Sequence, residues 1–448
     1  MEPGSHKSGT RLPEMFRALR YRNYRLFFSG QIVSLIGTWM QSVAQSWLVY
    51  RLTGSSLLLG LVGFVGQIPV FLLSPIGGVV ADHTSRRRIV IATQTSAMVL
   101  ALILSALTLL EHIQVWQIMV LASLLGIVNA FDIPARQSFI VEMVEPRDLI
   151  NAIALNSSMV NGARVLGPAI AGVLVAAIGE GWCFFANGVS YIAVIVGLLL
   201  MGVTPRAYPR RSGSGLQSVI EGFQFVARTG PIRALLLLLG LVSVTGMPYA
   251  VLMPIFADKI LHGGARGLGL LMGAAGLGAL AGALTLATKR EVRGLGRWIT
   301  YASLGFGASM IFFALSRSFL LSIALLVPVG FSMMLQMSSS NTLIQTMVPD
   351  ALRGRVMSVY AMMFMGMAPI GALMAGAIAS HLGAPVTVVL GGATCLAGSL
   401  IFRSRWPTLR GEARQLILAQ GMSSGEPPEG MTGQQAVSSE QEEPAGKG

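Results

Sequence analysis

Long apolar segments, separated by shorter polar ones, run through most of this sequence. A helix needs about 20 mainly apolar residues to cross a bilayer. Twelve segments are long enough, and they lie at approximately residues 26–50, 57–81, 89–110, 115–133, 152–178, 182–203, 233–260, 267–288, 297–316, 319–346, 356–380 and 384–402. The pattern predicts an all-α integral membrane protein with twelve transmembrane helices.

The polar intervals divide these spans into two sets of six. The longest internal interval, 204–232, contains a short amphipathic pattern at 216–227 that is typical of a helix lying at the membrane surface. The end of the chain, from about residue 421, has the Gly-, Glu-, Pro- and Ser-rich composition of a disordered segment. The predicted organisation is an N-terminal segment 1–25, a six-helix bundle 26–203, a linker 204–232, a second six-helix bundle 233–403 and a tail 404–448.

The two sets of spans share an internal repeat at an offset of about 204 residues. The stretch from Gly126 to Gly172 contains a span, a polar loop and a proline within the next span. The stretch from Gly330 to Gly376 repeats this order. Parallel repeats of six spans are a known plan for secondary transporters. We therefore expect two pseudo-symmetric bundles.

Composition agrees with a membrane protein and excludes several functional classes. Of 448 residues, 53% are hydrophobic and 11% charged, whereas about a quarter are charged in soluble domains. Cys183 and Cys395 lie in separate apolar segments, and the five histidines are scattered, so we expect neither a disulfide framework nor a metal site. A phosphate-binding loop and a catalytic cluster are lacking. We therefore expect no enzyme activity and no cofactor. The polar, basic first 25 residues also predict that no cleavable signal peptide opens the chain.

The formal net charge of +13 follows the membrane topology. With the N-terminus inside, the N-terminal segment, the loops after even-numbered spans and the C-terminal segment hold 27 of the 32 Lys and Arg residues. The other side keeps Arg51, Lys259, Arg266 and Arg317, and Arg164 alone lies within a span. The positive-inside rule thus predicts that both termini are cytoplasmic. Anionic lipid headgroups account for the basic charge, and no nucleic-acid-binding pattern is present.

The interval after the second span carries a recognisable motif. Residues 78–88 read Gly-Val-Val-Ala-Asp-His-Thr-Ser-Arg-Arg-Arg. They resemble the signature between spans 2 and 3 of the major facilitator superfamily, G-x-L-A-D-R-x-G-R-R, and depart from it at Val80, His83 and Ser85. The resemblance implies the superfamily fold, in which two six-helix bundles enclose a central site. Gly78 is expected to permit a close helix contact.

The same resemblance implies a conformational gate. Asp82 is expected to face the positive N-terminal end of helix 11, which Asp350 would open. Arg86 is expected to pair with a carboxylate at the end of helix 4, for which Asp132 is the candidate, and Arg87 belongs to the same gate. The alternative is that the arginines of this loop only anchor it on the positive side of the membrane.

A second set of residues narrows the resemblance. Residues 129–139, the pair at 151–152 and residues 164–172 are similar to an exporter branch that contains enterobactin exporters and macrolide efflux proteins, the transmembrane secretion effectors. The likeness covers about residues 14–405. It implies a monomeric secondary active transporter of the bacterial inner membrane. Such a protein exports siderophore-, drug- or macrolide-like small molecules by alternating access, in exchange for protons.

The fifth predicted span contains a possible hinge. Its Gly167-Pro168 segment is similar to the antiporter motif G-P-x-x-G-G, with Ala171 in place of the first paired glycine. Pro168 removes a backbone donor and kinks the helix. Gly167 and Gly172 are expected to pack helix 5 against its counterpart in the other half. The three residues are assigned to the gate, and a generic membrane kink is the alternative.

Charged residues inside the spans are the strongest candidates for function. Arg164 lies well inside its span, where an ionisable group is costly and usually faces a cavity or a partner. It is expected to recognise an anion or couple transport in a central cavity, or else to make a structural bond to helix carbonyls or to Asp132. Asp132 and Arg136 lie one helical turn apart, which favours pairing between them, and both are assigned to the gate.

Uncharged polar residues provide weaker candidates for substrate binding. Gln41 and Gln45 share one face of the first span. They would either bind substrate in a polar cavity or bridge to helix 5. Gln336 and Asn341 on the tenth span are similar candidates.

Two other functional classes stay open. One is a flippase or lysophospholipid transporter of the same fold, and the other is a membrane scaffold or sensor that acts through its tail. The predicted spans have no carboxylate near their middle, because Asp132 and Asp258 lie near span ends. Proton coupling is therefore implied by the resemblance alone.

Overall fold

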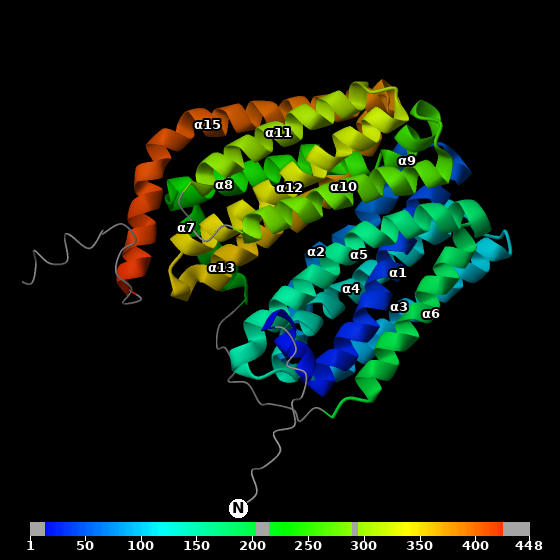
Figure 1. The fold of residues 1–448 in the computed structure, drawn as a ribbon, viewed down its shortest axis with the longest axis horizontal. Coiled ribbons are helices and arrows are strands. Elements are labelled where there is room, and N and C mark those ends of the chain that lie inside the picture. Colours follow the sequence, from blue (N-terminus) through cyan, green and yellow to red (C-terminus); the bar gives the residue numbers. More distant parts are fainter. Residues whose placement is uncertain (1–13, 203–214, 289–293, 424–448) are drawn as a thin grey trace, which may run out of the picture.

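The protein folds into two groups of long helices. The computed structural model describes residues 14–202, 215–288 and 294–423, which are almost entirely helical (Figure 1). The basic segments predicted near 206–211 and 289–293 lie outside the described residues, as does the tail from residue 424.

The first half contains six long helices. A short helical segment, η1 (Glu14–Arg20), precedes them, and η2 (Pro146–Asp148) joins the fourth to the fifth. The long helices are α1 (Arg22–Thr53), α2 (Ser56–His83), α3 (Arg86–Leu109), α4 (Val115–Met143), α5 (Leu149–Ile178) and α6 (Glu180–Leu199).

The second half follows α7 (Gly215–Arg228), a short helix within the predicted linker. Its seventh and eleventh spans are interrupted by π-helical turns, and such turns are frequent at functional sites. The seventh span consists of α8 (Gly230–Leu241), η3 (Val242–Gly246), η4 (Met247–Ala250), α9 (Met253–Ile255) and η5 (Phe256–Ile260). The eighth, ninth and tenth spans are α10 (Gly264–Ala287), α11 (Leu295–Leu315) and α12 (Phe319–Met347). The eleventh span consists of α13 (Asp350–Ala361), η6 (Met362–Gly366) and α14 (Met367–Leu382), and the twelfth is α15 (Ala384–Ser423).

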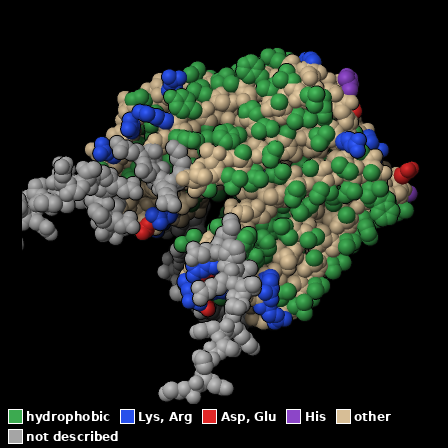
Figure 2. Space-filling view, in the orientation of Figure 1, with side chains coloured by type: hydrophobic (Ala, Val, Ile, Leu, Met, Phe, Trp, Pro, Cys, Tyr) green, Lys and Arg blue, Asp and Glu red, His purple; other side chains and the backbone are tan. Residues whose placement is uncertain are grey.

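Most of these helices have the length and composition of membrane spans. In the described residues, eleven stretches are long and apolar enough to cross a bilayer. The helix missing from this group is α1, which has 32 residues and packs along α5 and α6 but carries buried polar side chains such as Gln31, Ser34 and Gln41. Large apolar side chains, including Leu237 and Phe312, are exposed, and hydrophobic side chains spread over most of the face drawn in Figure 2. This surface fits a lipid environment.

Two helices extend beyond the predicted apolar segments. The fourth span was predicted to end at residue 133, but α4 continues to Met143. The last was predicted to end at 402, but α15 continues to Ser423 and turns across the end of the second half (Figure 1). Packing explains this extension, because Trp406 lies against Gly296 and Ala413 is buried. Apolar length alone therefore underestimates both helices.

The halves repeat each other in structure as well as in sequence. In the first half α2 packs on α4 and α3 on α6, while in the second α10 packs on α12 and α11 on α15. The matching glycines have matching partners. Gly126 lies against the carbonyl of Gly66, and Gly330 against the carbonyl of Ala275. The predicted pseudo-symmetry is confirmed.

The two halves meet through two helix crossings, α5 on α10 and α2 on α14. A Cβ on Gly172 would lie 2.7 Å from the Cα of Gly269, and a Cβ on Gly376 would lie 2.9 Å from the Cα of Gly60. No side chain larger than hydrogen fits either position without a shift of the backbone. Gly172 and Gly376 are the repeat-related residues found in the sequence, so the two crossings are equivalent contacts in the two repeats.

The halves diverge toward one end of the molecule. This end, which we call the basic end, carries η1, η2, the α2–α3 loop and the start of α13. Figure 1 shows the two halves separating there, and the space-filling view in Figure 2 shows a hollow between them. The opposite end, which we call the closed end, holds both glycine crossings. There the Ser56 hydroxyl donates to the Gly376 carbonyl at 3.1 Å.

Candidate functional site

A small cavity lies between the two halves. It has a volume of about 90 Å³ and is lined by Trp39 of α1 and by Arg164 and Pro168 of α5. Residues of the second half complete it, mainly Tyr249, Met253, Met272, Gly276, Ala279 and Met333. Because both halves contribute, any relative movement of the halves changes the shape of this cavity.

Arg164 is the charged residue of this cavity. Its guanidinium lies over the Trp39 ring, 5.4 Å from the ring centroid. The close approach of α10 at Gly276 brings the second half against the backbone carbonyl of Arg164. Among the described residues, no carboxylate lies within 4.0 Å of its side-chain nitrogens. The structure thus places Arg164 in a cavity rather than in a bond to Asp132.

Asp132 is buried within the first half and is fully occupied there. Its Oδ1 accepts hydrogen bonds from the Thr93 hydroxyl at 2.8 Å and from Gln94 Nε2 at 3.0 Å. Its Oδ2 pairs with Arg136 Nε at 3.2 Å. The predicted pairing of Asp132 with Arg136 is present, and the network ties α3 to α4. It lies away from the residues that line the cavity.

The predicted partner of Arg86 was wrong. Arg86 Nη1 donates to Glu142 Oε1 at 3.0 Å and to the Ser138 carbonyl at 3.3 Å. Sequence reasoning chose Asp132 because it ended helix 4 at residue 133. In the longer α4, the carboxylate at the helix end is Glu142, and Asp132 lies several turns deeper.

Asp82 and the start of helix 11 are separate in this structure. The Asp82 carboxylate is largely exposed and lies 3.9 Å from Arg86 Nη2, within the same half. Asp350, which begins α13, pairs with Arg353 instead. The expected contact between Asp82 and this helix end is absent among the described interactions, because the halves diverge at the basic end.

Arg87 and Gly78 also differ from the simple expectation. Arg87 donates to the carbonyls of Leu198 at 2.8 Å and Leu199 at 3.0 Å, where a cation stabilises the C-terminal end of α6. Gly78 has no atom within 4 Å of a Cβ built on it. The close contact belongs to Gly77, which lies against the Ala130 carbonyl of α4. Sequence reasoning chose the wrong member of a glycine pair.

The glycines of helix 5 face two different neighbours. Gly167 packs against Trp39 and the Ile36 carbonyl of α1, within its own half. Gly172 packs against Gly269 of α10, in the other half. Pro168 lies between them, buried and lining the cavity. Gly172 reaches the other half as expected, but its partner is the eighth span and not the counterpart of helix 5, and Gly167 contacts only its own half.

The four uncharged candidates are absent from the residues that line the cavity. Gln41 accepts a hydrogen bond from Asn187 Nδ2 at 2.6 Å and so joins α1 to α6, whereas the predicted bridge was to helix 5. Gln45 is partly buried. Gln336 is buried, and its Nε2 has no partner in the described structure. Asn341 accepts from Gln345 on the same helix. Of the four, Gln41 has a clear structural role.

Sequence reasoning missed Tyr249, which faces the cavity from the second half. It also missed the closed-end contact in which the Tyr50 hydroxyl donates to Asp258 Oδ2 at 2.8 Å. The Lys259 ammonium lies 5.9 Å from the Tyr50 ring centroid. The interrupted seventh span, which contains Pro248 and Pro254, was the signal available for these residues.

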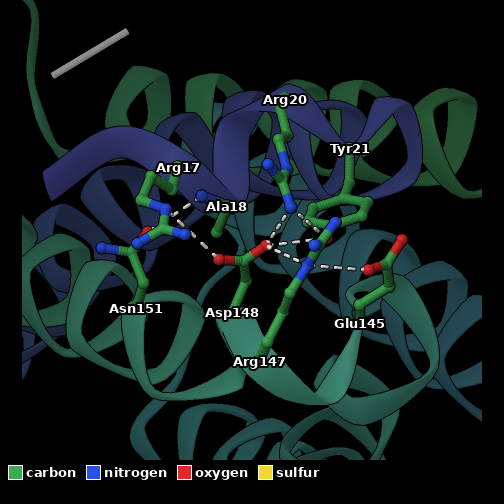
Figure 3. A network of polar contacts seen from close by, with 8 residues as sticks. All are labelled: Arg17, Ala18, Arg20, Tyr21, Glu145, Arg147, Asp148 and Asn151. Carbon is green, nitrogen blue, oxygen red and sulfur yellow. Dashed lines mark hydrogen bonds and ion pairs between the residues drawn. The ribbon is translucent and has the colours of Figure 1, made fainter. Parts of the chain in front are cut away.

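A third missed feature is a polar network around Asp148, at the basic end of the first half (Figure 3). Its buried carboxylate accepts from the Tyr21 hydroxyl at 2.7 Å and pairs with Arg20 at 2.5 Å and Arg17 at 3.6 Å. Beside it, Asn151 Oδ1 accepts from the backbone N–H of Ala18 at 2.9 Å. The network fixes η1 on the start of α5.

Two pseudo-symmetric bundles of spanning helices around an interfacial cavity define a transporter of the major facilitator superfamily. Within that class, the chain belongs to the transmembrane secretion effector family, whose profile matches residues 14–423. The family consists of transporters and not enzymes.

Curated relatives match over most of their length. A staphyloferrin A transporter of Staphylococcus aureus is 26% identical over 84% of this chain and 95% of the relative. The multidrug efflux pump Tap of Mycolicibacterium fortuitum is 26% identical over 78% and 88%, respectively. The enterobactin exporter EntS of Shigella boydii is 25% identical over 84% and 89%.

Solved structures share the fold at low sequence identity. A point mutant of the nucleoside transporter NupG superposes with a TM-score of 0.67 at 12% identity, covering 87% of this chain and 99% of NupG. A POT family transporter gives a TM-score of 0.69 at 14% identity, covering 87% and 96%. These likenesses establish the fold alone.

Proposed function

We propose that this protein exports siderophore-like or drug-like small molecules from a bacterial cytoplasm by alternating access. The main supporting observation is a cavity between two halves that are in contact at one end and apart at the other. The named relatives, two of which are called an exporter and an efflux pump, favour cargo of this kind.

The basic end is proposed to face the cytoplasm, with both termini there. Arginines of η1, η2, α3 and α13 gather at this end, as the positive-inside rule requires of cytoplasmic loops. The structure then corresponds to an inward-open state that receives cargo from the cytoplasm. Cargo leaves after the halves rock, so that the closed end opens and the basic end closes.

Closure of the basic end is proposed to use the α2–α3 loop and its two flanking helix ends, where Asp82 lies in the last turn of α2 and Arg86 begins α3. Arg86 already holds this loop to α4 through Glu142. Asp82 is exposed and free to meet the N-terminal end of α13 when the halves approach. A carboxylate at that position is stabilised by the helix dipole. Asp132, Arg136 and Arg87 would keep the first half rigid during the movement.

The driving force is proposed to be a proton gradient, with protons moving inward as cargo moves outward. Arg164 is the residue placed to link cargo binding to a change in the cavity. A transport assay tests the whole proposal. Purified protein in liposomes should accumulate labelled siderophore or macrolide when a pH gradient is imposed, and an ionophore that collapses the gradient should abolish the accumulation.

Three results would separate the alternatives. Accumulation that ignores every ion gradient would reject coupling. Movement of labelled lipid without movement of soluble cargo would favour a flippase. Transport that survives in a chain ending at residue 423 would disfavour a scaffold or sensor that acts through its tail. That truncation is preferable to one at residue 410, because residues 411–423 form part of α15, where Glu412 accepts from the N–H of Gly230 at 3.2 Å.

A further inference from the structure

We infer that the Arg164 cavity selects cargo by an anionic oxygen group attached to a flat apolar ring or body. The inference rests on the proposed transport function and names the chemical class of the cargo. Its starting point is a cation within a span that has no described carboxylate within 4.0 Å. A charge in such a setting is costly unless an opposite charge compensates it.

The two carboxylates near the ends of the predicted spans do not supply that compensation. Asp132 is occupied by Thr93, Gln94 and Arg136. Asp258 is held by Tyr50 at the closed end. The counter-ion of Arg164 must therefore come from a molecule that enters the cavity. A carboxylate or a deprotonated catechol suits the planar guanidinium, which binds paired oxygens through two parallel N–H groups.

The Arg164 side chain lines the cavity and forms no ion pair with a described residue. The Cζ atom of its guanidinium lies over the Trp39 ring, 5.4 Å from the ring centroid. Tyr249 lines the same cavity from the second half. An anionic group bound here would contact both halves at once.

The other residues that line the cavity, and its volume, indicate the polarity and size of the rest of the cargo. Met253, Met272 and Met333 give an apolar and adaptable wall. The volume of about 90 Å³ is smaller than the ~150 Å³ cavity known to hold benzene. A carboxylate fits in it, but a whole siderophore does not. The cargo therefore places its anionic head beside Arg164, and its apolar body extends toward the basic end.

A binding experiment with matched probes tests this inference without requiring transport. Full-length protein in nanodiscs is titrated with 1-naphthoate and with 1-naphthamide, which share a ring but differ in charge. Wild-type protein should bind naphthoate at least about tenfold more tightly, as expected for a charge-assisted hydrogen bond. R164Q should remove this preference, and R164K should retain a smaller one.

Two further variants distinguish the contribution of the anionic head group to binding from that of the ring. Trp39→Leu should weaken both probes by a similar factor, because it removes stacking surface. Arg317→Gln, at an exposed arginine outside the cavity, should leave both affinities unchanged. Wild-type protein that binds both probes equally, or neither, would overturn the inference, as would R164Q with an intact preference. Export failing in liposomes while the preference persists would instead overturn the proposed function alone.

Discussion

Arg164 and Arg136 are both arginines within long helices of the first half, but they differ in their surroundings. Arg136 has Asp132 at 3.2 Å, while Arg164 has an aromatic ring and a cavity. Removing one member of a buried pair leaves an uncompensated charge, whereas removing an isolated charge relieves a desolvation cost. The two residues therefore have opposite predicted effects on stability.

Arg164→Gln should leave the apparent unfolding temperature unchanged or raise it, because the variant loses an unpaired cation. Arg136→Gln serves as the matched control and should destabilise the protein by about 3 kcal/mol, since Asp132 stays buried. Thermal unfolding of both variants in the same detergent measures the difference. An equal loss of stability in both would show that Arg164 is a structural residue.

A second pair of variants addresses the two carboxylates near Arg86, those of Asp82 and Glu142. Glu142→Gln should lower stability by about 1–3 kcal/mol, because the Arg86–Glu142 pair is mostly buried. Asp82→Asn should change stability little, since its carboxylate is exposed and 3.9 Å from Arg86, yet it should slow transport if the loop closes the gate. Chemical denaturation and liposome transport are the measurements. Equal stability of the two variants would contradict the assignment of Glu142.

Helix positions could be predicted from the sequence wherever the thickness of the bilayer sets the length of an apolar segment. Spans were visible because apolar length is a direct consequence of bilayer thickness. The glycine repeat from Gly126 to Gly330 was visible because both positions face a neighbouring backbone. The end of α4 was not, because its polar last turns lie beyond the apolar segment. Because helix 4 was ended too early, Asp132 was chosen as the partner of Arg86 instead of Glu142.

Side-chain direction was harder to predict. Adjacent residues on a helix point about 100° apart, so the pair Gly77 and Gly78 allows only one of them to contact α4. Nothing in a single sequence distinguishes them. Tyr249 was missed for a similar reason, since the π-helical turn before it changes which face enters the cavity. Arg164 was identified because charge within a span is rare.

The two glycine crossings can be tested with a single added methyl group. Gly172→Ala should prevent close contact of α5 and α10, because the new Cβ would lie 2.7 Å from the Cα of Gly269. We expect the closed end to open and transport to fall. Gly162→Ala, in the same helix with nothing within 4 Å of its Cβ, is the control and should be neutral.

Opening of the closed end can be measured by the thiol reactivity of a Val251→Cys variant, because Val251 lies near Gly63 where the halves meet. In a background without Cys183 and Cys395, it should react faster with a membrane-impermeant thiol reagent when Gly172→Ala is present. Unchanged reactivity in that variant, together with normal transport, would show that the crossing does not control access.

The molecule as a whole is held in its present state by few polar contacts between the halves. In the described structure, the one side-chain to side-chain hydrogen bond between the halves joins Tyr50 to Asp258. The Ser56 hydroxyl adds a hydrogen bond to the Gly376 carbonyl, and the repeat-related glycine crossings bring the helices of the two halves together beside it. An arrangement of this kind favours movement of two rigid bodies over rearrangement within either one.

Tyr50→Phe should shift the population toward the state that is open at the closed end. Loss of a hydrogen bond to a carboxylate changes such an equilibrium by about tenfold. Distances between spin labels at the two ends would report the populations. Leu48→Met, a volume-conserving change at a buried position two residues away, is a suitable control. Identical distance distributions in Tyr50→Phe and wild type would exclude a locking role.

The pairing of glycine with glycine at both crossings also affects how fast the two halves can move relative to each other. Where Gly172 meets Gly269 and Gly376 meets Gly60, no side chains interlock. One helix can roll over the other there without any change of rotamer. If the halves rock as proposed, the barrier between the two forms would then reflect mainly the breaking of the hydrogen bonds at the closed end.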